Sequence, residues 1–252
     1  FTGSTEVGRE LLRRSADQVL KCAMELGGNA PFLVFDDADL DDALAGAMVA
    51  KLRNGGQACT AANRFLIQRG IYDAFAKGLV ERMAGLRVGP GADPGTDCGP
   101  LIDAAAVAKV DRLVRDAVDR GARVLTGGEP LPGPGHFYPP TVLVDVPPGA
   151  AILAEEVFGP VAALVPFDEE AEAVRAANDT VHGLVAYVYT GDLARGLRLA
   201  GAIESGMVAV NRGLVSDAAA PFGGVKQSGL GREGGAAGLL EYLEPTYIAT
   251  QW

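Results

Sequence analysis

Residues 31–35 read Pro-Phe-Leu-Val-Phe, and this short apolar run predicts a buried β-strand. The Ala-rich segment 40–52 follows and predicts a helix, with Asp36 or Asp39 as its N-terminal cap. A second apolar run at 64–68, Arg-Phe-Leu-Ile-Gln, predicts another strand. A strand, a helix and a strand in this order are typical of a parallel βαβ unit, so this stretch predicts the α/β class.

The same alternation continues on both sides of this unit. Further strands are expected at 123–126, 141–146, 161–167, 185–190, 207–211 and 241–250. Further helices are expected just after Ser4 and at 72–86, 104–120, 169–178 and 193–203, and the Gly-rich segment 213–235 predicts an irregular region. The pattern predicts an α/β fold with a mostly parallel sheet flanked by helices.

Composition excludes several classes of protein. The chain has 252 residues, of which 48% are hydrophobic and 21% charged, an ordinary balance for a globular protein. Its net charge of -10 makes nucleic acid and anionic membrane surfaces poor partners. No apolar run approaches the ~20 residues that span a bilayer, so no membrane partner is expected.

Cysteine and histidine usage limits the possible chemistry. The cysteines are Cys22, Cys59 and Cys98, an odd number without a Cys-x-x-Cys spacing. This pattern disfavours a disulfide framework or a zinc ribbon and favours a reducing compartment, so we expect a cytoplasmic protein. The histidines, His136 and His182, lie far apart in the sequence. We therefore expect no metal site.

Cys59 follows a Gly-Gly-Gln break, and the residues after it could open a helical turn. A thiol at that place would lie near unpaired backbone N–H groups, which lower its pKa and can also hold an oxyanion. The alternative is a buried, small hydrophobic residue, which is what most free cysteines are. The local sequence leaves both interpretations open.

Glu25 is a lone carboxylate between Met24 and Leu26, directly before Gly27 and Gly28. A carboxylate at the end of an apolar strand is either a surface residue at a boundary or a general base with a shifted pKa. The two glycines would let another backbone or a ligand approach closely. Here too the residue alone does not decide.

Two glycine patterns suggest phosphate binding, but neither is specific. The start of the chain, Phe1-Thr-Gly-Ser4, runs into a helix and is similar to a turn that cradles a phosphate. Gly229-x-Gly231-x-x-Gly234 formally matches the dinucleotide fingerprint. No strand precedes it and no helix clearly begins on it, so we interpret it as a loop.

Taken together and in order, five segments resemble the aldehyde dehydrogenase superfamily from one end of the chain to the other. They are Phe-Thr-Gly-Ser-Thr (1–5), Glu-Leu-Gly-Gly-Asn-Ala-Pro (25–31), Gly-Gln-Ala-Cys (56–59), Glu-Glu-Val-Phe-Gly-Pro (155–160) and Pro-Phe-Gly-Gly-Val-Lys-Gln-Ser-Gly (221–229). Four more stretches, 35–41, 51–54, 99–103 and 229–234, are most similar to the succinate-semialdehyde dehydrogenase branch.

The resemblance implies oxidation of an aldehyde to a carboxylic acid with NAD or NADP. Cys59 would attack the aldehyde, and a thioester would form after hydride transfer. Glu25 would activate Cys59 or the water that hydrolyses the thioester. The backbone N–H of Cys59 and the side chain of an Asn upstream of residue 1 would hold the oxyanion.

The resemblance also assigns binding residues. Gly3 and Ser4 match the turn beside the cofactor pyrophosphate, the Leu26 backbone lies near the nicotinamide, Glu156 holds the nicotinamide ribose, and Phe158 packs beside it. Arg53 and Ser216 match positions that bind the distal carboxylate of succinic semialdehyde, a role that suits the two-pronged guanidinium of an arginine. The alternative for Arg53 is a solvated cation at a helix end.

The same resemblance divides the chain into three parts. Residues 1–27 would end a dinucleotide-binding domain, 28–227 would form the catalytic domain, and 228–252 would return and end in a strand that pairs with a neighbouring subunit. A homodimer or homotetramer is therefore expected. The chain begins with Phe1 rather than Met, so we expect a piece of a longer chain that alone binds NAD(P) poorly and has little or no activity.

Other functions remain open at this point. One is a generic aldehyde dehydrogenase, or an acylating relative that passes the acyl group to coenzyme A. Glu25 as a hydrolytic base favours water as the acceptor. The other is a truncated chain that serves only in assembly, which the joint presence of Cys59, Glu25 and Glu156 disfavours.

Overall fold

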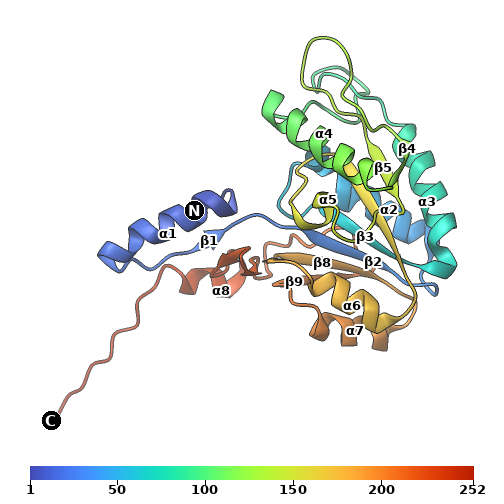
Figure 1. Cartoon of the computed structure of the whole chain (residues 1–252). Coiled ribbons are helices and arrows are strands. Elements are labelled where there is room, and N and C mark those ends of the chain that lie inside the picture. Colours follow the sequence, from blue (N-terminus) through green and yellow to red (C-terminus); the bar gives the residue numbers. More distant parts are fainter.

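The computed structural model describes all residues 1–252 and is built on one seven-stranded sheet with the order β4-β5-β6-β3-β2-β8-β9. Neighbouring strands are parallel except for β4, which pairs antiparallel with β5 at one edge. The strands are β2 (Ala30–Val34), β3 (Ala62–Gln68), β4 (Arg123–Thr126), β5 (Thr141–Val144), β6 (Val161–Phe167), β8 (Val185–Tyr189) and β9 (Met207–Val210). Figure 1 shows helices on both faces of this sheet, which confirms the predicted α/β fold with a mostly parallel sheet.

One face of the sheet is covered by α2 (Leu40–Leu52) and α3 (Arg69–Ala84). Helix α2 begins where the sequence predicts, because the Asp39 side chain accepts a hydrogen bond from the Asp42 backbone N–H at 3.0 Å. Aromatic side chains fill this layer, with Phe32 stacked on Tyr189 at 5.0 Å between ring centroids. This apolar layer fixes the end of α2 from which the candidate nucleophile loop departs.

The opposite face is covered by two groups of helices. The helices α6 (Glu170–Asn178) and α7 (Leu193–Ala202) bury residues such as Phe35 and Leu199 over one half of the sheet. The helices α4 (Ala104–Asp119) and α5 (Ala151–Ala154) pack over β5 and β6. The sheet is therefore buried on both sides, as parallel sheets usually are.

A separate arm is formed by segments from the two ends of the chain. It contains α1 (Thr5–Ser15), the short helical turn Ala16–Gln18, β1 (Met24–Glu25), β11 (Gly229–Leu230) and α8 (Gly235–Leu240). A separate two-stranded pairing joins β7 (His182–Gly183) to β10 (Val225–Lys226). Strand β1 pairs antiparallel with β11, so that Glu25 lies opposite Gly229. Figure 1 shows this arm beside the body of the molecule. Residues far apart in the sequence are thus held together next to the sheet.

The chain passes from the arm into the sheet through Gly27 and Gly28. A Cβ atom on Gly28 would lie 2.2 Å from the backbone carbonyl oxygen of Cys59. Only a glycine allows this approach, because real Cβ atoms do not come so close to a backbone oxygen. The junction therefore places the strand of Glu25 directly against the loop of Cys59.

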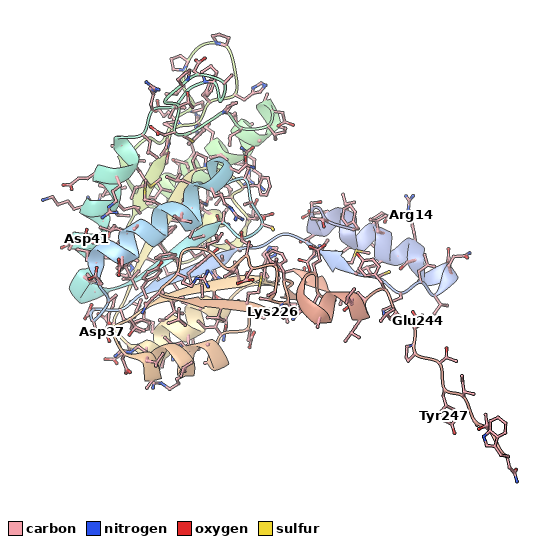
Figure 2. All side chains as sticks on the ribbon, turned by 180° about the vertical axis from the view of Figure 1, so that it is seen from behind. Arg14, Asp37, Asp41, Lys226, Glu244 and Tyr247 are labelled. Atoms are coloured by element: carbon pink, nitrogen blue, oxygen red, sulfur yellow. The ribbon has the colours of Figure 1, made fainter.

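The predicted final strand over residues 241–250 is not formed within the single chain, and its pairing with a neighbouring subunit stays a prediction. The segment forms no strand after α8, a short helix that the sequence analysis missed, and Figure 2 shows Tyr247 on a tail that extends away from the body. Tyr247, Ile248 and Trp252 are exposed. A strand needs a neighbouring strand to pair its backbone N–H and C=O groups, and no strand of this chain pairs with the tail.

No helix in the structure is long and apolar enough to cross a lipid bilayer.

The tight junction at Gly28 predicts a clear effect of a single methyl group. In Gly28→Ala, the new Cβ meets the Cys59 carbonyl oxygen, and one of the two backbones must shift. We expect the free energy of unfolding to fall by about 1–3 kcal/mol, the usual cost of overpacking, as measured by urea denaturation.

The matched control is Gly201→Ala in α7, where no atom lies within 4 Å of the added Cβ. This variant should gain about 0.5–1 kcal/mol, because alanine favours the helix over glycine. Equal effects of the two substitutions would show that the approach at Gly28 is not tight.

Candidate active site

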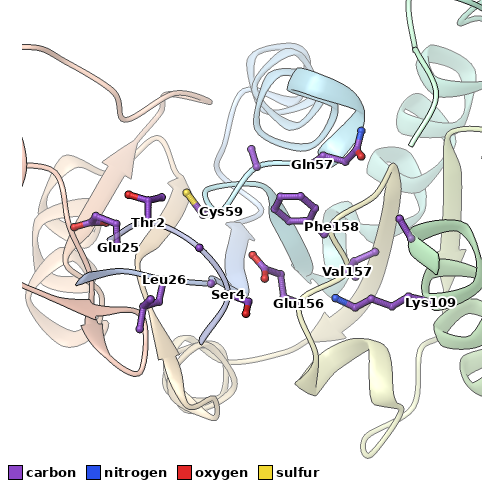
Figure 3. A pocket seen from close by; sticks show the side chains of 14 residues that line it. Thr2, Ser4, Glu25, Leu26, Gln57, Cys59, Lys109, Glu156, Val157 and Phe158 are labelled. Carbon is purple, nitrogen blue, oxygen red and sulfur yellow. The ribbon is translucent and has the colours of Figure 1, made fainter. Parts of the chain in front are cut away.

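A cavity of about 540 Å³ opens where the arm meets the body. Its lining comes from the start of the chain, the β1 end, the loop after α2, helix α4 and the segment after α5 (Figure 3). It brings together every residue that the sequence analysis assigned to catalysis or to the cofactor: Cys59, Glu25, Gly3, Ser4, Leu26, Glu156 and Phe158.

Cys59 lies on a loop that leaves the C-terminal end of α2. The 3₁₀ turn Arg53–Gly56 carries three successive left-handed residues, Asn54, Gly55 and Gly56, with φ of 54°, 63° and 77°. A Cβ on Gly56 would lie 2.2 Å from the carbonyl oxygen of Gly159. Glycine is therefore needed at this position, both for its φ and for the close backbone approach.

The local electrostatics of Cys59 differ from the sequence-based expectation. No helix follows Cys59, because the chain enters β3 at Ala62. Burial raises the pKa of the thiol, and the nearby carboxylates of Glu156 and Glu25 raise it further. The backbone N–H groups of Cys59 and Thr60 do favour the thiolate, as expected, but the predicted lowering of the pKa is wrong because burial and like charge outweigh them.

Glu25 is almost fully buried, with 6% of its surface exposed, and neither of its carboxylate oxygens has a hydrogen-bond partner. In Figure 3 its carboxylate points away from the Cys59 sulfur. It lies beside Gly223, whose hypothetical Cβ would be 2.9 Å from Oε1. Burial, reinforced by the charge of Glu233 and opposed by that of Arg232, raises the pKa of Glu25 to about 7. A carboxyl with such a pKa can accept or release a proton near neutral pH.

Glu156 connects the cavity to the glycine junction. Its Oε1 accepts a hydrogen bond from the Gly28 backbone N–H at 3.1 Å. Burial raises the pKa of Glu156, and this hydrogen bond opposes the rise. Two residues further on, Phe158 has a φ of 54°, which is uncommon for a bulky residue, and its side chain lines the cavity.

The N-terminal end of α1 forms another wall of the cavity. Ser4 caps this helix by accepting a hydrogen bond from the Val7 N–H at 3.3 Å. The Gly3 N–H donates to the Glu25 carbonyl at 3.0 Å, which holds the turn against β1. A helix N-terminus favours negative groups such as phosphate, so this wall suits the anionic part of a dinucleotide.

Three polar lining residues, Thr2, Gln57 and Lys109, were given no role by the sequence analysis. Lys109 comes from α4 and extends toward Glu156 in Figure 3, and its charge lowers the pKa of that carboxyl. Gln57 braces the loop, since its Oε1 accepts from the Ile102 N–H at 2.9 Å. A lysine within a helix gives no sequence signal for a site, whereas Gln57 lies within the Gly-Gln-Ala-Cys segment that was noted.

The two residues assigned to substrate binding do not line this cavity. Arg53 donates to the Thr60 hydroxyl at 3.3 Å, directly after the nucleophile position in the chain. Ser216 is exposed on the irregular segment after β9 and makes no side-chain hydrogen bond. In the same segment, Gly213 packs its backbone against Gly46 in α2. Arg53 thus directly follows α2, Ser216 lies three residues after a contact with that helix, and both lie outside the lining described above.

No group of three or more His, Cys, Asp or Glu side chains is arranged to hold a metal ion.

The sequence of this chain was compared with protein families and with known proteins. The model of the aldehyde dehydrogenase family matches residues 1–248. A succinate-semialdehyde dehydrogenase from Paenarthrobacter nicotinovorans is 55% identical over 248 residues, which are 98% of this chain and 55% of that protein. A glutarate-semialdehyde dehydrogenase from Pseudomonas putida is 53% identical over 98% of this chain and 51% of its own length.

Solved structures show the same similarity. The crystal structure of an NADP-dependent enzyme from E. coli superposes with a TM-score of 0.95 at 52% identity, covering 97% of this chain and 51% of that one. The chain thus spans about half the length of the proteins it matches.

The charge of Glu156 predicts a change in the reactivity of the thiol. In Glu156→Gln, loss of the negative neighbour should lower the pKa of Cys59 and raise the rate of its alkylation by iodoacetamide at a fixed, mildly alkaline pH. The matched control is Glu155→Gln, which removes the adjacent carboxylate that pairs with Arg112 at 2.6 Å. A Cys59→Ala protein corrects for the other cysteines, and equal rates in both glutamine variants would contradict the prediction.

The raised pKa of Glu25 predicts how stability depends on pH. Between pH 4.5, the ordinary value, and about 7, the folded protein binds a proton that the unfolded chain has released. The free energy of unfolding therefore falls as pH rises through this window, and Glu25→Gln removes the loss. Above the window the variant should be more stable than its parent by on the order of 1 kcal/mol, allowing for solvent screening.

Urea denaturation at acidic and alkaline pH measures this difference, which should vanish below pH 4.5. The exposed Glu169→Gln is the control and should show no pH-dependent gain. A gain for Glu25→Gln that is the same at both pH values would refute a buried, titrating carboxyl.

Proposed function

Because this chain belongs to the aldehyde dehydrogenase family, we propose that it supplies the nucleophile and the general base for oxidation of an aldehyde to a carboxylic acid with NAD(P)+. The observation that carries this proposal is the single cavity lined by Cys59, Glu25 and Glu156. These groups come from three separate elements, and each has a pKa that burial raises. Shifted pKa values gathered in one cavity are typical of catalytic sites.

In the proposed reaction, the Cys59 thiolate forms a C–S bond with the aldehyde carbon, and the carbonyl oxygen becomes an oxyanion. The backbone N–H of Cys59 is suited to hold that oxyanion. NAD(P)+, if held by Gly3, Ser4 and Glu156, would supply the hydride acceptor that converts this adduct into a thioester on Cys59. Water then attacks the thioester, the C–S bond breaks, and the thiol is regenerated with release of the acid.

Glu25 is the proposed base for the water. Its pKa of about 7 allows it to take the proton that water loses during attack on the thioester. Its carboxylate points away from Cys59 in Figure 3, so the role requires rotation of the side chain about its own torsions. The unpartnered oxygens support such a rotation, because no hydrogen bond has to break.

The cavity residues fit an NAD or NADP cofactor. The α1 N-terminus with Gly3 and Ser4 would hold the pyrophosphate, and Glu156 would hold the nicotinamide ribose through its carboxylate. Phe158 and the Leu26 backbone would lie beside the nicotinamide. The cavity volume of about 540 Å³ lies within the usual range for small-molecule sites. The E. coli structural relative is described as NADP dependent.

The proposed substrate is a small aldehyde with a distal carboxylate, most simply succinic semialdehyde. Two similar proteins are named for succinate semialdehyde and glutarate semialdehyde, which both carry such a group. Arg53 is the proposed carboxylate partner because its guanidinium lies against Thr60, next to the nucleophile. Ser216 would add a hydroxyl to the same carboxylate.

The tail suggests how the protein assembles. Residues 241–250 expose apolar and aromatic side chains and have no strand neighbour in this chain. We propose that they form a strand against a second copy, giving a homodimer or homotetramer by β-augmentation. A cytoplasmic location fits the unpaired cysteines of the chain.

An activity assay tests the proposal on the longest natural chain that contains this sequence. NAD(P)H formation should be faster with succinic semialdehyde than with butanal. Cys59→Ala should abolish it, and Glu25→Gln should reduce it by roughly 10²–10⁴-fold, the usual contribution of a general base. Arg53→Met should reduce kcat/KM for succinic semialdehyde by about 10–150-fold, as expected for a lost charged hydrogen bond, and should affect butanal oxidation much less.

Arg120→Met is the matched control, since Arg120 is exposed at the end of α4 and pairs with Asp116. Equal rates with both aldehydes would remove the substrate assignment but leave the dehydrogenase chemistry. Full activity of Cys59→Ala would contradict the proposed mechanism, in which Cys59 is the nucleophile.

A further inference from the structure

Lys51 lies in the last turn of α2 and has no exposed surface at all. A lysine is almost never buried completely unless it is paired, because removing an ammonium from water is costly. The reaction proposed above does not use Lys51, and the side chain does not line the cavity. Its burial therefore calls for a separate explanation.

The Lys51 ammonium has one protein partner, the side-chain oxygen of Asn63, at 2.8 Å. Lys51 precedes the loop that carries Cys59, and Asn63 lies at the start of β3, directly after that loop. Asn63 is also buried, with 1% of its surface exposed. This hydrogen bond therefore joins the two ends of the nucleophile loop across the interior of the protein.

The loop between these ends has little regular structure of its own. It passes through the left-handed turn at Asn54 and Gly55 and is closed locally by the Asn54 side chain, which donates to the Gln57 carbonyl at 3.0 Å. No strand pairing begins before β3. A bond between the loop ends is thus well placed to limit how far the backbone of Cys59 can move.

Charge adds a second connection. Burial lowers the pKa of Lys51 to about 7, and the Glu156 carboxylate acts in the opposite direction. In return, the charge of Lys51 lowers the pKa of Glu156. Each group thus favours the ionised form of the other, and ionised Glu156 is the form that best accepts the hydrogen bond from the Gly28 N–H.

We propose that Lys51 is a positioning residue, whose bond to Asn63 fixes the Cys59 loop. The importance of this arrangement for turnover rests on the function proposed above, whereas the ordering of the loop does not. Two apolar side chains of similar volume would be at least as stable as this buried polar pair. The pair therefore serves local geometry rather than overall stability.

The test compares single and double substitutions. Lys51→Met leaves the Asn63 oxygen without its partner in the core, so both global stability and loop order should fall. Lys51→Met combined with Asn63→Leu removes both polar groups, so stability should return to the parent value or above. Loop order should not return, because the bond between the loop ends is still missing.

Hydrogen exchange of residues 53–61 measures loop order without any assay of activity. In the double variant, these amides should exchange about tenfold faster or more than in the parent, the factor expected for loss of one charged hydrogen bond. Alkylation of Cys59 should also become faster as the half-buried sulfur gains access to solvent. Exchange in α3 and β2 should stay unchanged.

Ile67→Val is the matched control, since Ile67 is fully buried on the same strand as Asn63. It should lower stability without faster exchange in the loop. Asn63→Asp keeps the acceptor and adds a counter-charge, so it should preserve loop protection even if the double variant fails to fold.

Recovery of both stability and loop protection in the double variant would overturn the proposal, and so would loss of loop protection in a folded Asn63→Asp. Turnover separates the two hypotheses. A parent protein that oxidises no aldehyde would count against the proposed function, yet the exchange results would still decide the role of Lys51.

Discussion

The site depends on the close contact between the backbone of Gly28 and the carbonyl oxygen of Cys59. This contact brings the end of β1, with Glu25, against the loop after α2, and the Gly28 N–H then reaches the Glu156 carboxylate at 3.1 Å. Three groups that are far apart in the sequence meet because one residue has no side chain. Any larger residue at this position would force the nucleophile loop away from the base.

A second constraint is the like charge of the groups that meet there. Cys59, Glu25 and Glu156 all have a pKa raised by burial, and two of them carry charges that oppose ionisation of the thiol. Burial and the charges of Glu156 and Glu25 therefore oppose ionisation of the Cys59 thiol, although Lys109 contributes one positive charge to the cavity wall. A cationic group that enters the cavity would reverse this balance and favour the thiolate. The arrangement thus links reactivity of Cys59 to occupancy of the cavity.

Much of the fold could be predicted because local signals and packing agree. The helix 40–52 was predicted with the bounds of α2, since Asp39 caps it and the apolar face beyond is continuous. The third helix begins at Arg69, three residues earlier than predicted, because the chain turns directly from β3 into α3. The strand expected at 241–250 is absent from the single chain for a different reason: its amino acids suit a strand, but pairing depends on a neighbour that this chain does not supply.

The candidate site, like the fold, could be predicted from the sequence only in part. Motifs identified Cys59, Glu25 and Glu156, but no pattern in the sequence revealed that Lys109 faces the cavity. The sign of the pKa shift of Cys59 was also wrong, since it depends on burial and on carboxylates that only folding brings near. The separation of residues along the sequence predicts neither the position of Lys109 nor the direction of the pKa shift of Cys59.

The C-terminal end of α2 provides two side chains that contact the chain just after Cys59. Lys51 points into the core and binds Asn63, whereas Arg53, two residues later, is exposed and binds the Thr60 hydroxyl. The backbone leaves the helical conformation at Arg53, with a ψ of 127°, and this change separates the directions of the two side chains. Both partners lie just after Cys59 in the chain, so one buried contact and one exposed contact join the end of α2 to the segment that follows the nucleophile. The inner contact is shielded from salt and water, while the outer cation remains free to meet a ligand carboxylate.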